Sequence, residues 1–242
     1  MTGTAQTTVV RLAAPLLAWP QPSRYRFRYS CQLPTRSALR GLLAAAAGYG
    51  RATSSTWLDH RELVVRADDP GRNLRDFHTI SPPDLHHYRW LSPRDQRAVT
   101  TVASAAGKPR GSAVVTERFY REGATYLLLI ADDDARVAKL LSAPHWAIYA
   151  GRKGCPLTFP LLLGRYGGTP EQAVAAVPSA CGQGPRTVAL FQPPAELEAT
   201  GPQQLYDRPG PDGDHPQDRW TAHTVPQQLH DWFAVAAWLA QR

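Results

Sequence analysis

Tyr126-Leu127-Leu128-Leu129-Ile130 is the stretch of this 242-residue chain that decides the fold. A nearly continuous apolar run of this length is typical of a strand that is buried on both faces of a sheet. The next segment, Asp132 to Leu141, is predicted to be a short helix with acidic residues in its first turn, where they favour the positive end of the helix dipole. This strand and helix form the second half of the predicted sheet.

The first half of the sheet is predicted upstream of this run. Thr7 to Trp19 is predicted to be an opening strand, and Pro34-Thr35-Arg36-Ser37 begins a helix that runs to about Gly48. Thr35 is the predicted N-cap, and a second strand is predicted at Glu62 to Ala67. One face of the helix carries apolar residues at helical spacing, namely Leu39, Leu42, Leu43 and Ala46.

A long polar and cationic stretch separates the second strand from the central apolar run. After the turn Asp68-Asp69-Pro70-Gly71, the sequence has no apolar periodicity up to about Gly123. Because a structureless loop of that length is improbable inside a compact domain, we predict an extruded hairpin or a functional arm. Its cationic residues are Arg72, Arg75, Arg89, Arg94, Arg97, Lys108, Arg110, Arg118 and Arg121.

The predicted order of elements defines the fold class. Strand, helix, strand, arm, strand and helix follow one another as in an α+β, ferredoxin-like or RNA-recognition-type sheet. Trp146 to Ala150 is predicted to supply the fourth strand. The remaining predicted elements are a short helix at Pro170 to Val177, a strand at Thr187 to Phe191, a mobile loop at Gly201 to Asp218 and a closing amphipathic helix at Gln227 to Leu239.

The charge balance points to a polyanionic partner. The net charge is +7, and 24 of the 27 cationic residues are arginines, whose planar guanidinium groups suit phosphate contacts and base stacking. A GC-rich coding bias is an alternative reason for preferring arginine over lysine. It does not explain the excess of positive charge.

The remaining composition excludes several classes of protein. No apolar run approaches the roughly 18 residues that span a bilayer, and we expect no secretory signal, no membrane partner and a cytoplasmic protein. Three widely spaced cysteines argue against a disulfide framework or a zinc finger, so we expect no metal and no cofactor. Carboxylate pairs at metal-site spacing, the Gly-x-Ser-x-Gly elbow and a dinucleotide fingerprint are also missing.

Two segments are candidate phosphate sites. At Pro34-Thr35-Arg36-Ser37, the start of the predicted helix offers unpaired backbone amides together with a hydroxyl and a guanidinium, a combination that binds phosphate. The alternative is that Thr35 or Ser37 simply caps the helix and that Arg36 points into solvent. In Gly151-Arg152-Lys153-Gly154-Cys155-Pro156, two glycines let the backbone approach a ligand, and two cations neutralise a phosphodiester.

A third candidate surface lies in the predicted loop from Gln21 to Leu33. Arginines alternate there with aromatic residues, so an extended backbone would place cations on one side and aromatics on the other, a combination that stacks nucleobases. The alternative is an exposed strand with its aromatic face packed down. The residues are Arg24, Arg26 and Arg28 with Tyr25, Phe27 and Tyr29.

The sequence supports a catalytic site less well than it supports a phosphate-binding site. Cys155 lies beside Arg152 and Lys153, which would favour its thiolate, but the sequence identifies no base and packing is the better interpretation. His78 and the pair His86-His87 are the best candidates for ribonuclease-like proton transfer. A structural histidine is the alternative for His78.

Four motifs follow one another along the chain in a fixed order. They are Arg11 to Trp19 (RLAAPLLAW), Pro34 to Leu43 (PTRSALRGLL), Leu74 to Thr79 (LRDFHT) and Tyr149 to Leu157 (YAGRKGCPL). Taken together they resemble the CasD-type subunits of the type I-E CRISPR Cascade complex. Their order and spacing match from about Thr7 to Gly164, whereas the tail resembles the family weakly. Gly154 stands where relatives often carry serine, and the helix lacks a further glycine at Leu42 to Ala46.

The resemblance implies a repeat-associated RNA-binding palm over residues 1–200, a thumb hairpin inserted at about 77–121, and a C-terminal extension at 201–242 that packs on the palm. Such a subunit holds the 5′ handle of the CRISPR RNA and locks the adjoining backbone subunit. It caps the assembly beside the large subunit, and the whole complex holds the target DNA. In type I-E systems a separate subunit cuts the precursor, so the resemblance implies no catalytic residue here.

The resemblance also assigns RNA contacts residue by residue: Arg36, Ser37, Arg118, Tyr149, Arg152 and Lys153. Two alternatives remain open. One is a metal-independent endoribonuclease that processes repeat RNA, with His78 or Lys153 as candidates, and the other is a general RNA-binding protein outside CRISPR immunity.

Overall fold

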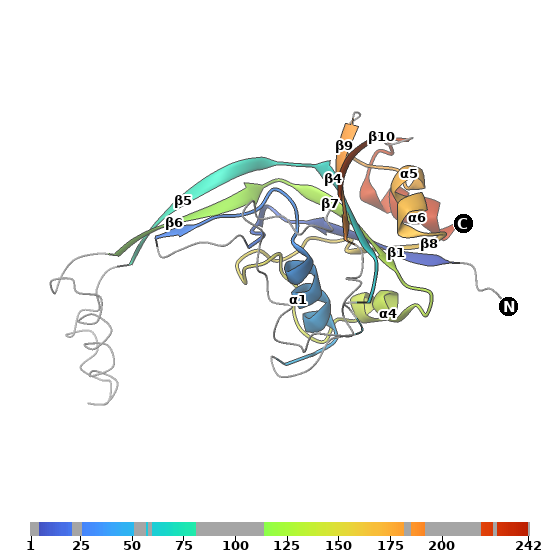
Figure 1. The fold of residues 1–242 in the computed structure, drawn as a ribbon, viewed down its shortest axis with the longest axis horizontal. Coiled ribbons are helices and arrows are strands. Elements are labelled where there is room, and N and C mark those ends of the chain that lie inside the picture. Colours follow the sequence, from blue (N-terminus) through green and yellow to red (C-terminus); the bar gives the residue numbers. More distant parts are fainter. Residues whose placement is uncertain are drawn as a thin grey trace.

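The computed structural model describes most of the chain, namely residues 5–20, 26–50, 57, 60–80, 114–181, 185–191, 219–224 and 227–241. Within these residues the strands form two sheets (Figure 1). The first has six strands in the order β10-β9-β4-β7-β1-β8, and each neighbouring pair is antiparallel. Its strands are β1 (Gln6–Ala13), β4 (Leu63–Asp69), β7 (Thr125–Ala131), β8 (Leu162–Gly167), β9 (Pro185–Phe191) and β10 (Arg219–Thr224).

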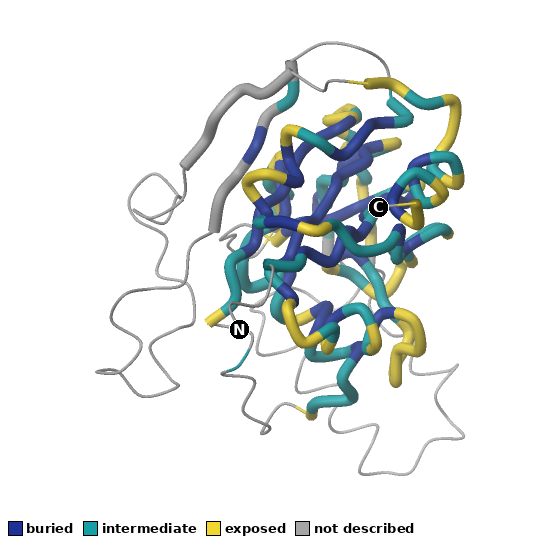
Figure 2. Tube along the Cα trace, turned by 90° about the vertical axis from the view of Figure 1, so that its right-hand side faces the viewer, coloured by how far each residue is buried: buried dark blue, intermediate teal, exposed yellow. Residues whose placement is uncertain are grey.

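The central apolar run forms β7, between β1 and β4. Successive side chains of a strand point to opposite faces. Tyr126, Leu128 and Ile130 therefore enter one hydrophobic core, and Leu127 and Leu129 enter another. All five are fully buried, as the sequence predicted, and burying each leucine stabilises the fold by roughly 1.5–3 kcal/mol. Figure 2 shows this buried centre in dark blue.

Helices cover both faces of the six-stranded sheet. On one side, α1 (Arg36–Ala46) and α4 (Arg136–Ser142) supply residues to the first core. On the other side, α5 (Pro170–Ala176) and α6 (Trp232–Ala240) supply residues to the second (Figure 1). The result is an α+β fold with one sheet between two helical layers.

The first helix confirms its sequence prediction. Thr35 is the N-cap, and its hydroxyl accepts a hydrogen bond of 3.3 Å from the Ala38 amide. The buried residues of the helix are the predicted ones, Leu39, Leu42, Leu43 and Ala46.

The second helix begins later than predicted. It starts at Arg136, and no acid lies in its first turn. Asp132 lies before the helix instead, fully buried, and its carboxylate accepts hydrogen bonds of 3.0 Å from the amides of Val137 and Ala138. The acid thus satisfies the first-turn donors from outside the helix.

The prediction of a fourth strand at Trp146 to Ala150 is wrong. The amides of His145 and Trp146 donate to the carbonyls of Ala46 and Ala45, so this segment covers the end of α1 instead of joining a sheet. The fourth strand is β8, beginning at Leu162 and paired with β1.

A second, four-stranded sheet leads away from the first. It contains β2 (Leu16–Leu17), β3 (Phe27–Arg28), β5 (Arg72–Ile80) and β6 (Val114–Glu122). The antiparallel ladder of β5 and β6 runs from the pair Arg72 and Glu122 to the pair Ile80 and Val114, and it extends away from the helices as a long curved ribbon (Figure 1). The predicted arm begins in this ladder, and residues 81–113 lie outside the described residues.

The C-terminal part differs in detail from the sequence prediction. The helix α5 and the strand β9 confirm it, whereas β10 was not predicted and pairs with β9. The last helix begins at Trp232, not Gln227, and its N-cap Asp231 accepts a hydrogen bond of 2.7 Å from the Ala234 amide. The predicted loop from Gly201 to Asp218 lies outside the described residues. None of the described helices is long and apolar enough to cross a membrane.

A buried ion pair ties α5 to the sheet. Arg66 and Asp68 on β4 are 0% and 1% exposed, and two hydrogen bonds of 2.6 and 2.9 Å join the guanidinium to the carboxylate. The same guanidinium donates to the carbonyls of Val174, Val177 and Pro178 at the end of α5. These three carbonyls lie at or just after the end of α5, where the helix provides no further donors. The guanidinium of Arg66 therefore supplies them with a charged hydrogen-bond donor.

Candidate nucleic-acid interface

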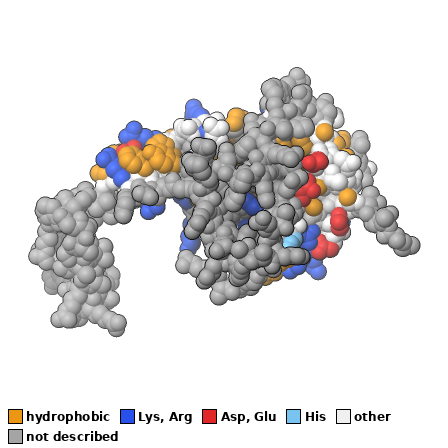
Figure 3. Space-filling model, in the orientation of Figure 1, with side chains coloured by type: hydrophobic (Ala, Val, Ile, Leu, Met, Phe, Trp, Pro, Cys, Tyr) orange, Lys and Arg blue, Asp and Glu red, His pale blue; other side chains and the backbone are white. Residues whose placement is uncertain are grey.

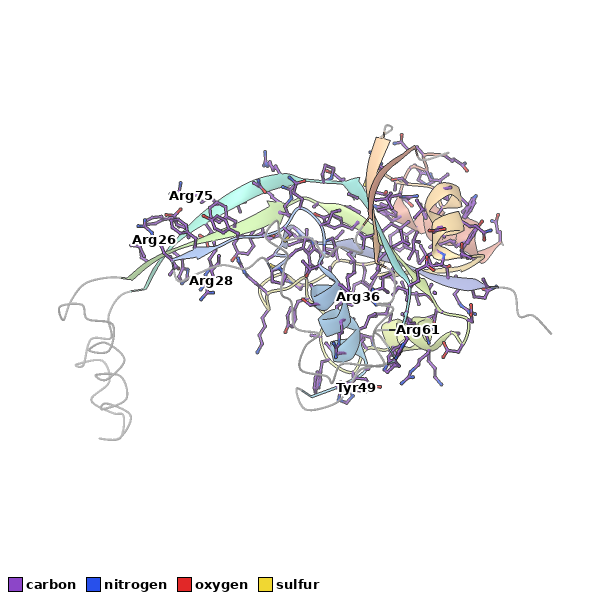
Figure 4. All side chains as sticks on the ribbon, in the orientation of Figure 1. Arg26, Arg28, Arg36, Tyr49, Arg61 and Arg75 are labelled. Carbon is purple, nitrogen blue, oxygen red and sulfur yellow. The ribbon has the colours of Figure 1, made fainter. Side chains whose placement is uncertain are left out.

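The ladder formed by β3, β5 and β6 presents two different faces. Residues opposite each other in a sheet share a face, and Arg118 is opposite both Arg28 and Asp76. Glu117, the neighbour of Arg118, points to the other face and is opposite Phe27 and Phe77. Figure 4 shows Arg28 and Arg75 on opposite sides of the ribbon. Figure 3 shows cationic and hydrophobic side chains side by side over this ladder.

The segment Tyr149 to Pro156 folds as a tight loop. Its ends form a bridge between Tyr149 and Pro156. Inside it, the Ala150 amide donates to the Cys155 carbonyl at 2.8 Å, and the Cys155 amide donates to the Arg152 carbonyl at 2.9 Å. The Ala18 amide donates to the Ala150 carbonyl at 3.1 Å, so the loop is fixed to the segment after β2.

The two glycines of this loop differ in their surroundings. Gly151 has a φ of 78°, in the left-handed region that favours glycine, and its backbone lies against the carbonyl of Ala18. Gly154 has open space where a side chain would be. The close approach that the sequence assigned to a ligand is therefore, at Gly151, an approach to another part of the same chain.

Arg152 joins the loop to the ladder. Its Nη2 donates a hydrogen bond of 3.1 Å to the carbonyl of Arg28 on β3, and its Cζ lies 4.5 Å from the centre of the Tyr120 ring on β6. Its Nη1 is shielded from solvent and has no hydrogen-bond partner within the part of the chain that the structure describes. Tyr120 follows Arg118 by two residues and so shares its face of the ladder. We call Arg28, Arg118 and Arg152 the cationic face.

The other predicted RNA-contact residues lie in two places, on the loop beside the cationic face and at the start of α1. Tyr149 is half-buried at the start of the loop, and Lys153 is exposed on it. Arg36 and Ser37 lie on a different element, the start of α1, where Arg36 donates to the Arg61 carbonyl at 3.3 Å. The structure thus brings Arg152 to the strands that carry Arg28 and Arg118, and it gives Arg36 a separate partner.

Cys155 is a packing residue in this structure. It is 1% exposed and belongs to the first hydrophobic core. Burial raises the pKa of its thiol, and the charge of the nearby Arg152 offsets only part of that rise. A protonated, inaccessible thiol agrees with the packing interpretation and disfavours a nucleophile.

The opposite side of the ladder carries stacked aromatic rings. The Phe27 and Tyr29 rings are 5.9 Å apart with an interplanar angle of 8°, and the Tyr29 and Phe119 rings are 5.0 Å apart at 29°. The Cζ of Arg26 lies 5.5 Å from the centre of the Phe27 ring. The expected separation of arginines from aromatics therefore holds for Arg28 but not for Arg26. Arg24 and Tyr25 lie outside the described residues.

Glu117 is the residue that sequence reasoning missed. Its side chain is 6% exposed and lies between Arg26 at 3.2 Å and Arg75 at 2.7 Å, so one carboxylate ties the residue before β3 and the strand β5 to β6. The signal was present in the sequence, because Glu117 is the only acid between Val114 and Arg121.

The histidine candidates gain no catalytic partner from the described residues. His78 is on β5 opposite Thr116, whose hydroxyl donates to the His78 carbonyl at 3.4 Å. Among the residues that the structure describes, no group of three or more His, Cys, Asp or Glu is placed to hold a metal ion. His86 and His87 lie outside the described residues.

Comparisons with known proteins identify the class. The family model described as "CRISPR-associated protein (Cas_Cas5)" matches residues 7–226. The chain therefore belongs to the Cas5 family of CRISPR-associated proteins. It is 31% identical over 167 residues to the CRISPR system Cascade subunit CasD of Escherichia coli (strain K12), a match that covers 64% of this chain and 69% of CasD.

Two solved structures share the fold. A chain of a "CRISPR RNA-guided surveillance complex" aligns with a TM-score of 0.68 at 21% identity, covering 98% of this chain and all of that one. A second structure, titled "Crystal structure of Cas protein", aligns with a TM-score of 0.55 at 20% identity, covering 93% of this chain and all of that one.

Proposed function

We propose that this chain is the subunit of a type I-E CRISPR surveillance complex that holds the 5′ handle of the CRISPR RNA. The observation that carries the proposal is the bridge made by Arg152, which fixes the loop against β3 and β6 beside Arg28 and Arg118. A rigid loop next to several guanidinium groups suits an RNA backbone. Family membership and the identity to CasD support the same assignment.

We propose that the palm is ferredoxin-like, spans residues 1–200 and carries the thumb as an insertion. The order β1-α1-β4-β7-α4-β8 along the chain and β4-β7-β1-β8 across the sheet support this interpretation. The thumb is the ladder of β5 and β6 with the residues between them, at about 77–121. The extension at 201–242 packs on the palm, since β10 pairs with β9 and α6 contributes to the second core.

The proposed RNA contacts fall into two kinds. Arg36, Arg152 and Lys153 neutralise phosphates and position the strand, as charged side chains do in most protein–RNA interfaces. Tyr149 stacks on or flanks a handle base, and Arg118 serves either purpose. Ser37 adds a hydroxyl donor at the start of α1.

The proposed partners are the handle RNA, the backbone subunit held by the thumb and the large subunit docked nearby, with target DNA held by the whole complex. We expect the assembly to be cytoplasmic. The subunit acts without catalysis, because a separate subunit cuts the precursor RNA in this type of system.

The deciding experiment incubates the purified full-length chain with labelled RNA of the repeat from its own CRISPR array, in EDTA. We expect specific binding of the half of the repeat that becomes the 5′ handle, and intact RNA after prolonged incubation. Specific cleavage that disappears in His78→Ala would establish the endoribonuclease alternative instead. Equal affinity for unrelated RNA of the same length would favour a general RNA-binding protein.

A further inference from the structure

We infer that Tyr120 is a positioning residue, which holds the guanidinium of Arg152 in place to receive one phosphate of the bound RNA. This inference rests on the proposed function and concerns the same site. The geometry that motivates it is the 4.5 Å separation between the Arg152 Cζ and the centre of the Tyr120 ring. A cation over an aromatic face is attracted by the negative potential of the ring.

Two contacts fix the orientation of the guanidinium. The Tyr120 ring fixes its plane, and the hydrogen bond of 3.1 Å from Nη2 to the Arg28 carbonyl fixes its rotation in that plane. An arginine side chain otherwise has many rotamers, and restricting them before binding reduces the entropy lost when a ligand arrives. The site is therefore organised in advance of RNA binding.

Arg152 keeps a donor for a ligand on its exposed side. The hydrogen bond from Nη2 to the Arg28 carbonyl lies in exposed surroundings, and Nη2 carries a second N–H that this bond does not use. Within the described residues, Nη1 is shielded from solvent and makes no hydrogen bond, so it is not the atom that a phosphate reaches. A phosphate oxygen is the best match, because Arg28 and Arg118 lie on the same side of the ladder and charge-assisted bonds to phosphate are strong. Asp76, opposite Arg118, and Glu122, which is paired with Arg72, are acids on the same face and limit its net positive charge.

Tyr120 and Arg28 contribute in separable ways. Arg28 contacts Arg152 through its backbone carbonyl, so replacing the Arg28 side chain removes a charge without removing that contact. Tyr120 contributes its aromatic ring and has no cationic group that could pair with a phosphate. Any effect of Tyr120 on the salt dependence of RNA binding must therefore pass through Arg152.

The experiment is a double-mutant cycle on the full-length chain with labelled repeat RNA, and affinity is measured at several salt concentrations. We expect Tyr120→Leu to weaken binding roughly three- to tenfold and to lower the salt slope by about 0.7, the value for one phosphate on single-stranded RNA. Arg152→Ala should lower the slope as much or more. In the double variant, Tyr120→Leu should have no further effect. Tyr120→Phe retains the ring and should bind like the wild type.

The outcomes separate the inference from the proposed function. Additive losses, an unchanged slope in Tyr120→Leu or weakened binding in Tyr120→Phe would each overturn the positioning role while leaving RNA binding intact. Failure of the wild-type chain to prefer repeat RNA would instead overturn the proposed function. Melting temperatures are recorded for every variant, and Tyr120→Met replaces Tyr120→Leu if leucine unfolds the ladder.

Discussion

Gly151 lies so close to Ala18 that a Cβ atom added to it would be 1.7 Å from the Ala18 carbonyl oxygen. No side chain fits at that distance, and the φ of 78° is itself unfavourable for any residue with a Cβ. The glycine is therefore needed for the loop to lie against the segment after β2. Since Arg152 follows directly, its direction toward β3 and β6 depends on this contact.

Gly151→Ala is expected to destabilise the protein and displace the loop. The left-handed backbone alone costs roughly 1–2 kcal/mol, and relieving the clash with Ala18 adds to this. Urea denaturation measures the loss of stability, and RNA affinity reports the displacement of Arg152. Gly154→Ala is the matched control, because the space around Gly154 is open. A similar stability for both variants would show that the contact with Ala18 is unimportant.

Arg152→Ala combined with Lys153→Ala is expected to weaken RNA binding and flatten its salt dependence. Each phosphate neutralised on a single strand contributes about 0.7 to the slope of log affinity against log salt, so the pair should lower it by about 1.4. Fluorescence anisotropy across a salt series provides the measurement. Lys139→Ala on α4 is the control, since it removes an exposed cation from another element. A slope that stays at the wild-type value would remove the loop from the interface.

Asp68→Asn is expected to destabilise the chain by roughly 3–5 kcal/mol, the usual cost of breaking a buried ion pair. The charge of Arg66 is then left uncompensated in a site that is 0% exposed. Chemical denaturation of both proteins gives the difference. Glu122→Gln, which breaks the exposed pair with Arg72, is the control and should change stability little. Equal effects of the two substitutions would mean that burial does not determine how much each ion pair contributes to the free energy of unfolding.

The sequence predicted those elements whose local signals agree with their packing. The apolar run at Tyr126 to Ile130 and the capped helix after Thr35 were predicted correctly, because one pattern specifies both secondary structure and burial. Trp146 to Ala150 misled the prediction, since its strand-like residues cover the end of α1. The backbone amides of this region bond to α1 because the fold brings the two segments together, and the spacing of apolar residues along the sequence does not encode such a tertiary contact.

The candidate site was predictable as a set of residues but not as an arrangement. Arg118 and Arg152 were both identified, yet their common position depends on the parallel pairing of β3 with β6, which joins segments about 90 residues apart. Tyr120 belongs to no motif, and Glu117, although it is the only acid between Val114 and Arg121, gives no sign in the sequence of which arginines surround it. Their importance comes from the side chains that the fold brings to them, namely the Arg152 guanidinium over the Tyr120 ring and two guanidinium groups around the Glu117 carboxylate.

Stability is expected to fall in alkaline solution partly because of Cys181. Burial, together with the carboxylates of Asp68 and Asp69, raises the pKa of this thiol to about 11 from an ordinary value of 9.0. The folded state therefore holds the thiol proton more tightly than the unfolded state does, and this contribution is complete below about pH 9 and lost as the pH rises through about 11. Thermal melting between pH 7 and pH 11 should show a smaller loss in Cys181→Ala than in the wild type. Val174→Ala destabilises the second core without removing a titrating group, so it should lower the whole curve and leave its pH dependence unchanged.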